Sequence, residues 1–542
     1  MKIDKYLIFL WLLSVIGLIF FVGHYSGILI DFGREVYYPE QILNGKVLYK
    51  DLFNIYGPFA YQINAILYKI FGTKLSALYG AGIVCSLLTV SGIYLIAKKF
   101  LSEFLSFCIG IFTIVIGIAT TSIFNFHFPY SWAMLYGLIS FLYSLLFLLK
   151  FEENKNEKYL YLSSFLAGIC VACKYDFLLY SLVVLFFIFK NRSMKAFLSF
   201  LAIPVLSFGI LFIQGMRFSD IINTLQIVNT MAHTKTLTYF YQNSGVYFHP
   251  KSILWNIFQF LVFGFVFGLF LFGWNLFKKE KYFFKLLSII LCITALMISY
   301  VIYTTAIKIS LSFFPLLIVI FSICIYKKLD TKTTILIVST FAANIKILWA
   351  LMLGSYGTYY APIILITVLV LLKVLFKNYE KAFSLYLLFI CLIYFSFDCY
   401  GLDISKQFIN TPRGKIATST PLAKSSNELI EFINKNTKPD DRIVIFPEGM
   451  IINFLANRKS DDWYNSLLPL YIETFGEDKI IEHFKSNKPD YIVFNNLDMK
   501  DYYYNYICQN YALGFCEFVK NNYKQETVIS NGYLRYLVFK RI

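Results

Sequence analysis

Long apolar runs separated by short polar segments constrain this chain more than any other feature. Of its 542 residues, 58% are hydrophobic and 20% are aromatic, and the mean hydropathy is +0.63. A soluble core does not hold so much apolar surface, whereas a bilayer requires about 20 apolar residues for each spanning helix. We therefore expect a polytopic α-helical membrane protein with about 13 transmembrane helices.

The apolar runs define the expected spans, and the basic residues define their orientation. The expected spans are residues 6–30, 75–97, 101–124, 130–150, 159–173, 177–189, 196–215, 253–277, 283–303, 309–326, 333–353, 360–377 and 382–397. Every second connection is rich in lysine, as at Lys98-Lys99 and Lys327-Lys328. Basic loops remain in the cytoplasm, so the N-terminus should be cytoplasmic and the chain after the last span extracytoplasmic. This distribution accounts for the net charge of +17 without nucleic acid as a partner.

The composition changes after residue 397. Residues 401–427 are polar and contain proline and glycine, so we expect a linker. Helix-like and strand-like patterns then alternate, which predicts a small extracytoplasmic α/β domain over residues 428–542. Pro447-Glu448-Gly449 follows an expected strand and predicts a turn, with acceptor binding as a weaker alternative. Cys508 and Cys516 could form a disulfide there, although their spacing does not decide it.

The expected first external loop, residues 31–74, combines charged and aromatic residues. It begins with Asp31-Phe32-Gly33-Arg34-Glu35 and continues with Asn44-Gly45, Tyr49-Lys50-Asp51-Leu52-Phe53, Tyr56-Gly57-Pro58 and Phe71-Gly72. The spacing of apolar groups predicts two short helices along the membrane surface, over residues 34–50 and 56–71. An acid and a base at the water face of a membrane indicate either catalysis or helix capping.

These motifs resemble the first external loop of GT-C glycosyltransferases, in particular the bacterial branch related to protein O-mannosyltransferases and the lipid A aminoarabinose transferase. The resemblance implies a GT-C-like transmembrane domain over residues 1–400, a polyprenyl-phosphate sugar as donor, and inverting transfer to an extracytoplasmic acceptor. It makes Asp31 the general base. The family's motif begins with Asp followed by Glu, and here Phe32 stands in place of the second acid.

Further residues can be given roles in such a transfer. Arg34, Lys174 and Lys346 are candidates for binding the donor phosphate, because cations stabilise a departing phosphate. Candidates for binding other parts of the substrates are Glu35, Tyr56, Tyr61, His249 and Lys251.

Each role has a structural alternative. Asp31 and Glu35 could cap and charge the start of a surface helix. Lys346 could extend to the interface, and Lys174 could form an exposed turn with Asp176. The tyrosines could belong to an interfacial aromatic belt.

Cofactors are not expected. The acids and histidines show no dense metal-ligand spacing, and a monophosphate donor does not require a divalent ion, so we predict metal-independent transfer. No Gly-rich loop suits a nucleotide phosphate.

The expected partners are a polyprenyl-phosphate sugar, membrane lipid and an envelope glycan, lipid or protein acceptor, with the protein in the bacterial cytoplasmic membrane. The alternatives are a transporter or flippase, or a polymerase or ligase, of lipid-linked glycans.

Overall fold

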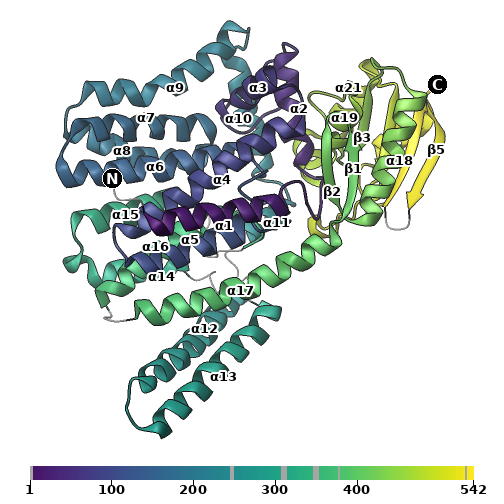
Figure 1. The fold of residues 1–542 in the computed structure, drawn as a ribbon. Helices are drawn as coiled ribbons and strands as arrows, with labels where there is room; N and C mark the ends of the chain where they lie inside the picture. The colour runs from purple at the N-terminus through teal and green to yellow at the C-terminus, as the bar shows by residue number, and fades with distance from the viewer. Residues whose placement is uncertain (1–3, 245–249, 307–313, 346–352, 376–378, 532–533) are drawn as a thin grey trace.

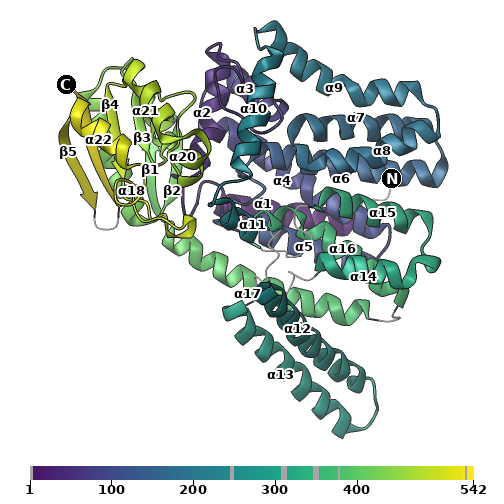
Figure 2. The ribbon, with the colours of Figure 1, turned by 180° about the vertical axis from the view of Figure 1, so that it is seen from behind.

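In the computed structural model, a large helical body is joined to a small α/β domain by one long helix, α17 (Glu380–Ile404) (Figure 1). The structure describes residues 4–542 except 245–249, 307–313, 346–352, 376–378 and 532–533. The view from behind shows the α/β domain covering one end of the helical body, beside α2 (Phe32–Leu43) (Figure 2). This end therefore carries both the loop over residues 31–74 and the C-terminal domain.

The helical body contains the helices that were expected to span the membrane. Besides α2 and α17, its helices are α1 (Lys5–Phe21), α3 (Phe59–Phe71), α4 (Leu75–Lys98), α5 (Glu103–Gly117), α6 (Trp132–Asn154), α7 (Glu157–Cys173), α8 (Leu178–Lys190), α9 (Met194–Ile213), α10 (Phe218–Met231), α11 (Leu237–Ser244), α12 (Pro250–Phe277), α13 (Tyr282–Ala306), α14 (Phe314–Ile325), α15 (Thr331–Ala343) and α16 (Gly357–Leu375). Short 3₁₀ turns occur at η1 (Tyr175–Phe177) and η3 (Tyr326–Lys328).

Each expected span overlaps one of these helices, but their lengths differ. In the described ranges, seven helices are long and apolar enough to cross a bilayer, namely α4, α6, α9, α12, α13, α16 and α17. Helices α1, α5 and α15 are apolar but shorter. A multi-pass membrane protein is therefore supported, while the count of 13 spans remains a prediction.

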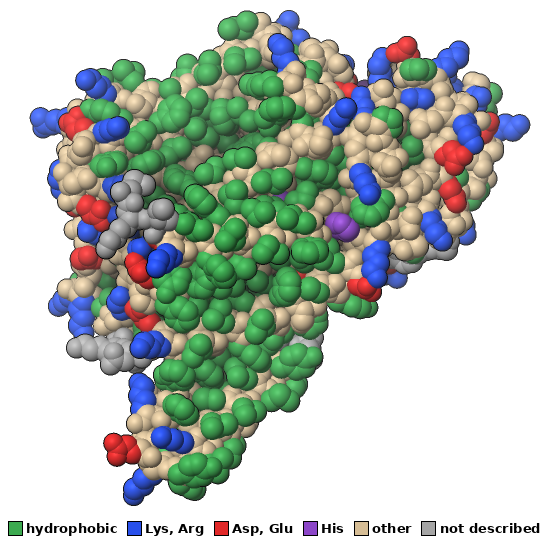
Figure 3. All heavy atoms as spheres, viewed as in Figure 1, with side chains coloured by type: hydrophobic (Ala, Val, Ile, Leu, Met, Phe, Trp, Pro, Cys, Tyr) green, Lys and Arg blue, Asp and Glu red, His purple; other side chains and the backbone are tan. Residues whose placement is uncertain are grey.

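The surface of the helical body agrees with burial in lipid. Figure 3 shows hydrophobic side chains over most of its visible face, and Lys and Arg side chains toward the helix ends remote from the α/β domain. Large apolar side chains are exposed on several helices, including Ile19 at 72% and Leu254 at 66%. Water would not tolerate a continuous apolar surface of this size, whereas a bilayer would.

The expected external loop 216–252 is helical where it is described. Helix α10 follows Arg217, whose backbone N–H donates a hydrogen bond to Asp220 at 2.7 Å. Beyond it, the Thr236 backbone N–H donates to Glu473 of the α/β domain at 3.2 Å. This segment therefore connects the helical body to the C-terminal domain.

The α/β domain is built on a mixed sheet of order β3-β4-β6-β5. Strand β3 (Ile443–Phe446) pairs in parallel with β4 (Tyr491–Asn495), and β6 (Leu534–Arg541) pairs antiparallel with β4 and with β5 (Tyr523–Asn531). The remaining helices of this domain are α18 (Thr420–Asn436), α19 (Met450–Ala456), α20 (Pro469–Phe475), α21 (Glu477–Ser486), η5 (Lys500–Tyr502) and α22 (Leu513–Asn522). Strands β3, β4 and β6 correspond to the strands expected from the sequence.

Residues 401–427, expected as a linker, carry regular structure instead. They contain the end of α17, the antiparallel hairpin of β1 (Gln407–Thr411) and β2 (Gly414–Thr418), and the start of α18. The hairpin buries Ile409 and Ile416 completely. Pro412 lies in its turn, Gly414 begins β2 and Pro421 lies in the first turn of α18, and that is why the composition resembled a linker.

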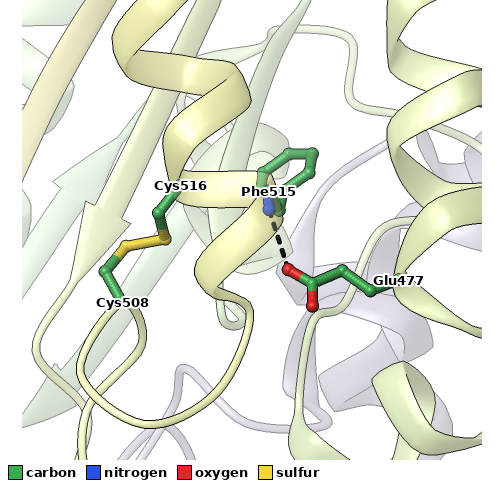
Figure 4. The surroundings of a disulfide bond; sticks show 4 residues. All are labelled: Glu477, Cys508, Phe515 and Cys516. Carbon is green, nitrogen blue, oxygen red and sulfur yellow. Dashed lines mark hydrogen bonds between the residues drawn. A yellow bond between two sulfur atoms is a disulfide. The ribbon is translucent and has the colours of Figure 1, made fainter.

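Cys508 and Cys516 form a disulfide at the start of α22 (Figure 4). Beside it, Glu477 at the start of α21 accepts a hydrogen bond from the Phe515 backbone N–H at 2.7 Å. A structural disulfide is typical of oxidising compartments, in agreement with the expected extracytoplasmic location of this domain.

Candidate functional site

Asp31 lies where the loop over residues 31–74 meets the C-terminal domain. It precedes α2 in the left-handed backbone region, with φ 66°, and its side chain makes no capping hydrogen bond. Its backbone N–H instead donates to Glu448 Oε1 at 2.7 Å. Helix capping, the structural alternative for Asp31, is therefore not supported by the geometry.

Phe32, which occupies the place of the second acid in the family motif, belongs to a buried aromatic cluster. Its ring stacks on Phe128 with the centroids 4.6 Å apart and the planes within 6°. It is also 4.8 Å from the ring of Tyr25. A carboxylate could not replace this side chain without losing apolar packing.

Arg34 lies in the first turn of α2 and faces a group of tyrosines. Its guanidinium carbon is 5.3 Å from the ring centre of Tyr56 and 5.4 Å from that of Tyr130, and its Nε donates to the Tyr61 hydroxyl at 3.2 Å. Nη2 is buried and has no hydrogen-bond acceptor within the described residues. Such a donor is costly to leave unpaired, and it has the chemistry needed to bind an anionic oxygen.

Lys174 reaches Tyr56 from the end of α7. Its side chain is 3% exposed, its Nζ is 3.1 Å from Asp176, and the ring centres of Tyr56 and Tyr356 are 5.2 Å and 4.6 Å away. The exposed turn expected as an alternative for Lys174 and Asp176 is therefore wrong for the lysine. Burial is accompanied by an ion pair and cation–π contacts, which lower its cost.

Gly57 explains how Tyr56 and Lys174 come together. The Gly57 backbone N–H donates to the Cys173 carbonyl at 2.9 Å. A β-carbon at this position would lie 2.1 Å from the Ala172 carbonyl oxygen. Only glycine permits the loop over residues 31–74 to approach the end of α7 so closely.

Glu35 acts as a structural connection between three helices. One carboxylate oxygen accepts the Trp132 backbone N–H at 3.0 Å, and the other accepts the Tyr61 hydroxyl at 3.0 Å. The carboxylate therefore lies at the N-terminus of α6, where a negative charge is favourable, and it also contacts Arg34 Nε at 3.5 Å. It holds α2, α3 and α6 together around the site.

Sequence reasoning missed Tyr130, which links the acid to the tyrosines. Its hydroxyl is 2.9 Å from that of Tyr56, and a hydrogen bond from Tyr130 to the Asp31 carboxylate favours the ionised acid. The Tyr359 hydroxyl donates to the Tyr130 carbonyl at 2.7 Å. Among many tyrosines in loops, no local pattern distinguished Tyr130.

Glu448 is the second residue that was not assigned to the site. It belongs to the turn between β3 and α19, and its Oε2 is 3.4 Å from the Ser466 hydroxyl. The Asn495 side chain donates to its backbone carbonyl at 2.8 Å and holds the turn. The signal in the sequence was an acid between proline and glycine after a strand, which predicted the turn but not its partner.

Burial dominates the electrostatics of the three acids. It raises the pKa of Asp31 above the usual range, against the lowering effect of the Arg34 charge. Burial, together with the Asp31 charge, raises the pKa of Glu448 to about 8. Burial also raises the pKa of Glu35, again opposed by Arg34. Two acids in contact cannot both ionise easily, so one of Asp31 and Glu448 tends to retain a proton.

One predicted site residue within the described ranges is not assembled with this group. Lys251 is exposed in the first turn of α12. Lys346 and His249 lie outside the described residues. No group of three or more His, Cys, Asp or Glu side chains suited to a metal ion occurs in the part of the chain that the structure describes, and metal independence remains a prediction.

A polar cavity of about 710 Å³ lies between the second half of α2 and the C-terminal domain. Tyr37 and Gln41 of α2 and Asn44, which follows the helix, line it opposite Trp463 and His483. Its charged groups pair with one another, as in the 2.8 Å contact between Lys46 and Asp462. The cavity therefore marks an ordered, hydrophilic contact between the two parts of the protein.

One family model matches part of the chain. Residues 56–213 match the model of the family described as dolichyl-phosphate-mannose-protein mannosyltransferase. Tyr56, Tyr61 and Lys174 lie inside the matched segment, whereas Asp31, Arg34 and Glu35 precede it. No curated protein matches the chain significantly.

The solved structures that match this chain share little sequence with it. The archaeal oligosaccharyltransferase AglB from Archaeoglobus fulgidus, in complex with an inhibitory peptide and a dolichol-phosphate, is 12% identical with a TM-score of 0.49, over 94% of this chain and 70% of that chain. ArnT from Cupriavidus metallidurans bound to undecaprenyl phosphate is 11% identical with a TM-score of 0.43, over 99% of this chain and 97% of that chain. Over residues 56–213, this chain is similar to the family described as dolichyl-phosphate-mannose-protein mannosyltransferase.

Proposed function

We propose that the protein is a membrane glycosyltransferase that moves a sugar from a polyprenyl-phosphate donor to a hydroxyl-bearing acceptor outside the cytoplasmic membrane. The observation that carries this proposal is the meeting of two cations, Arg34 and Lys174, at one tyrosine, Tyr56. The matched family is named for a prenyl-phosphate sugar donor, in agreement with a phosphate at this position.

In the proposed reaction, Asp31 is the general base. Its carboxylate takes the proton from the acceptor hydroxyl while the hydroxyl oxygen forms a bond to the anomeric carbon. The bond between that carbon and the phosphate oxygen breaks at the same time, and its electron pair leaves with the polyprenyl phosphate. Attack from the side opposite the leaving group inverts the configuration.

Arg34 and Lys174 would stabilise the leaving phosphate through different donor groups. Arg34 offers Nη2, a donor without an acceptor within the described residues, and a guanidinium suits paired phosphate oxygens. Lys174 offers an ammonium group that is partly neutralised by Asp176. Together they would stabilise the negative charge that develops as the phosphate departs.

The test is sugar transfer in liposomes that contain the purified protein, a panel of polyprenyl-phosphate sugars and cell-envelope acceptors. We expect Asp31→Asn to lower kcat by about 10² to 10⁴, the usual contribution of a general base, with donor affinity retained. Lys174→Met should instead weaken binding of the polyprenyl-phosphate sugar, by roughly tenfold for one lost charged contact. Lys69→Met, on the exposed face of α3, is the control.

Normal turnover by Asp31→Asn would show that the Asp31 carboxylate is not the general base of the chemical step. If wild-type protein moved lipid-linked sugar across the bilayer without transferring it, the alternative of a transporter or flippase would replace the proposal. If it joined glycans from two lipid-linked donors, it would be a polymerase or ligase of such glycans.

A further inference from the structure

Glu448 holds the proposed base from the opposite part of the molecule. Its carboxyl oxygen accepts the Asp31 backbone N–H at 2.7 Å, and the residue is 7% exposed. Asp31 has φ 66°, a conformation that is unfavourable for a residue with a β-carbon. A strong hydrogen bond to its backbone N–H therefore stabilises a conformation that the loop alone would rarely adopt.

The backbone on both sides of this contact is closely packed. A β-carbon on Gly33 would lie 2.5 Å from the Ile451 nitrogen and from the Met450 β-carbon. The start of α2 and the start of α19 thus touch through their main chains. The position of Asp31 is tied to the β3–α19 turn, and small shifts of the C-terminal domain would be transmitted to it.

A buried carboxyl beside another acid is a costly way to satisfy one N–H group. A neutral amide could accept the same hydrogen bond without charge repulsion. The groups facing Glu448 are Asp31 and Arg34 from the α2 side, Ser466, Tyr471 of α20 and Tyr502 of η5. Among these, only Arg34 is cationic, and Glu35 also contacts it. A second acid at this place therefore needs a further reason.

We propose that Glu448 is the second carboxyl group of the site, a positioning residue from the C-terminal domain that fixes Asp31 through the hydrogen bond to its backbone N–H. The inference rests on the proposed function, because it takes Asp31 to be the base. Glu448, far along the chain, would supply the second acid that the loop motif lacks because Phe32 stands in its place. The C-terminal domain then completes the site rather than only extending from the membrane.

The experiment compares transfer kinetics of Glu448→Ala, Glu448→Gln and Asp31→Asn in liposomes. Glu477→Ala is the matched control, because Glu477 also accepts a backbone N–H at 2.7 Å in the same domain but faces α22 (Figure 4). We expect Glu448→Ala to lower kcat by tenfold or more, a loss of about 1.4 kcal/mol, with little change in KM for the donor. Glu448→Gln should recover most of kcat, because its amide oxygen still accepts the Asp31 N–H.

The other outcomes would overturn the inference, and they distinguish a wrong role for Glu448 from a wrong base. Wild-type kcat in Glu448→Ala, with Asp31→Asn inactive, would overturn the role of Glu448 and leave the proposed function intact. Equal losses in Glu448→Ala and Glu477→Ala would show a general weakening of the domain, and failure of Glu448→Gln to recover kcat would exclude positioning through the hydrogen bond. Full activity of Asp31→Asn would overturn the proposed base itself.

Discussion

Glu448 and Asp31 together set the charge at the junction of the two parts of the protein. The pKa of Glu448 is raised to about 8 by burial and by the Asp31 charge, from an ordinary value of 4.5. Between pH 4.5 and about pH 8, Glu448 therefore retains its proton in the folded protein, whereas it has lost that proton in the unfolded chain. Stability should fall as the pH rises through this window, since the folded state binds more protons than the unfolded state.

This linkage predicts the behaviour of Glu448→Gln. The amide has no proton to lose, so the variant should keep more of its stability between pH 5 and pH 8 than wild type does. Thermal unfolding midpoints in detergent, measured at both pH values, provide the test. Asp31 is present in both proteins and its titration is shared, so an identical pH dependence in the two would contradict the raised pKa of Glu448.

At the scale of elements, α2 connects the helical body to the C-terminal domain. Its first residues contact α19, Glu35 contacts the start of α6, and Glu40 forms a bidentate ion pair with Arg413 of the β1–β2 turn at 2.7 Å for both contacts. The helix also contains Pro39, which removes one backbone donor. Contacts with its neighbours, rather than propensity, hold this helix in place.

The close approach of α2 and α19 predicts a large effect for Gly33→Ala. The added methyl group would meet main-chain atoms of α19 at 2.5 Å, and overpacking of this kind costs about 1–3 kcal/mol. We expect a lower unfolding midpoint and a reduced kcat, because the start of α2 and Asp31 would shift together. Gly27→Ala, where a β-carbon has no neighbour within 4 Å, should be close to wild type; equal behaviour of the two variants would contradict the packing argument.

At the scale of the whole molecule, the basic loops and the C-terminal domain lie toward opposite ends of the helical body (Figures 1 and 3). This arrangement agrees with cytoplasmic basic loops and an extracytoplasmic domain. The described ion pairs Lys98–Glu103 at 2.7 Å and Lys99–Glu153 at 2.8 Å join loops at the basic end. The disulfide lies in the C-terminal domain, in agreement with the same orientation.

Labelling of introduced cysteines tests this topology. In a background where the exposed Cys324 and Cys399 are changed to serine, we expect Lys438→Cys to react with a membrane-impermeant maleimide in intact cells. Lys279→Cys, in the connection between α12 and α13, should react only after the membrane is opened. Both positions are exposed, so reaction at Lys279→Cys in intact cells would reverse the orientation.

The sequence determined the features that depend on local pattern. Apolar runs predicted the positions of the membrane helices, because bilayer thickness and backbone hydrogen bonding leave few alternatives. Alternating patterns predicted three of the four strands in the main sheet, and the missed β5 is only partly buried and carries charged residues, so its pattern is weak. The loop motif identified Asp31, Arg34, Tyr56 and Tyr61 as candidates, and Lys174 was noted for its charge within apolar sequence.

Only the tertiary structure decided which candidates meet. Tyr56 and Lys174 lie more than 100 positions apart in the chain, and they come together because Gly57 permits contact with the end of α7. Glu448 reaches Asp31 across 417 positions, and no local pattern records such a contact. The sequence shows which side chains suit the chemistry, whereas long-range packing determines which acid stands beside which, and therefore which one holds a proton.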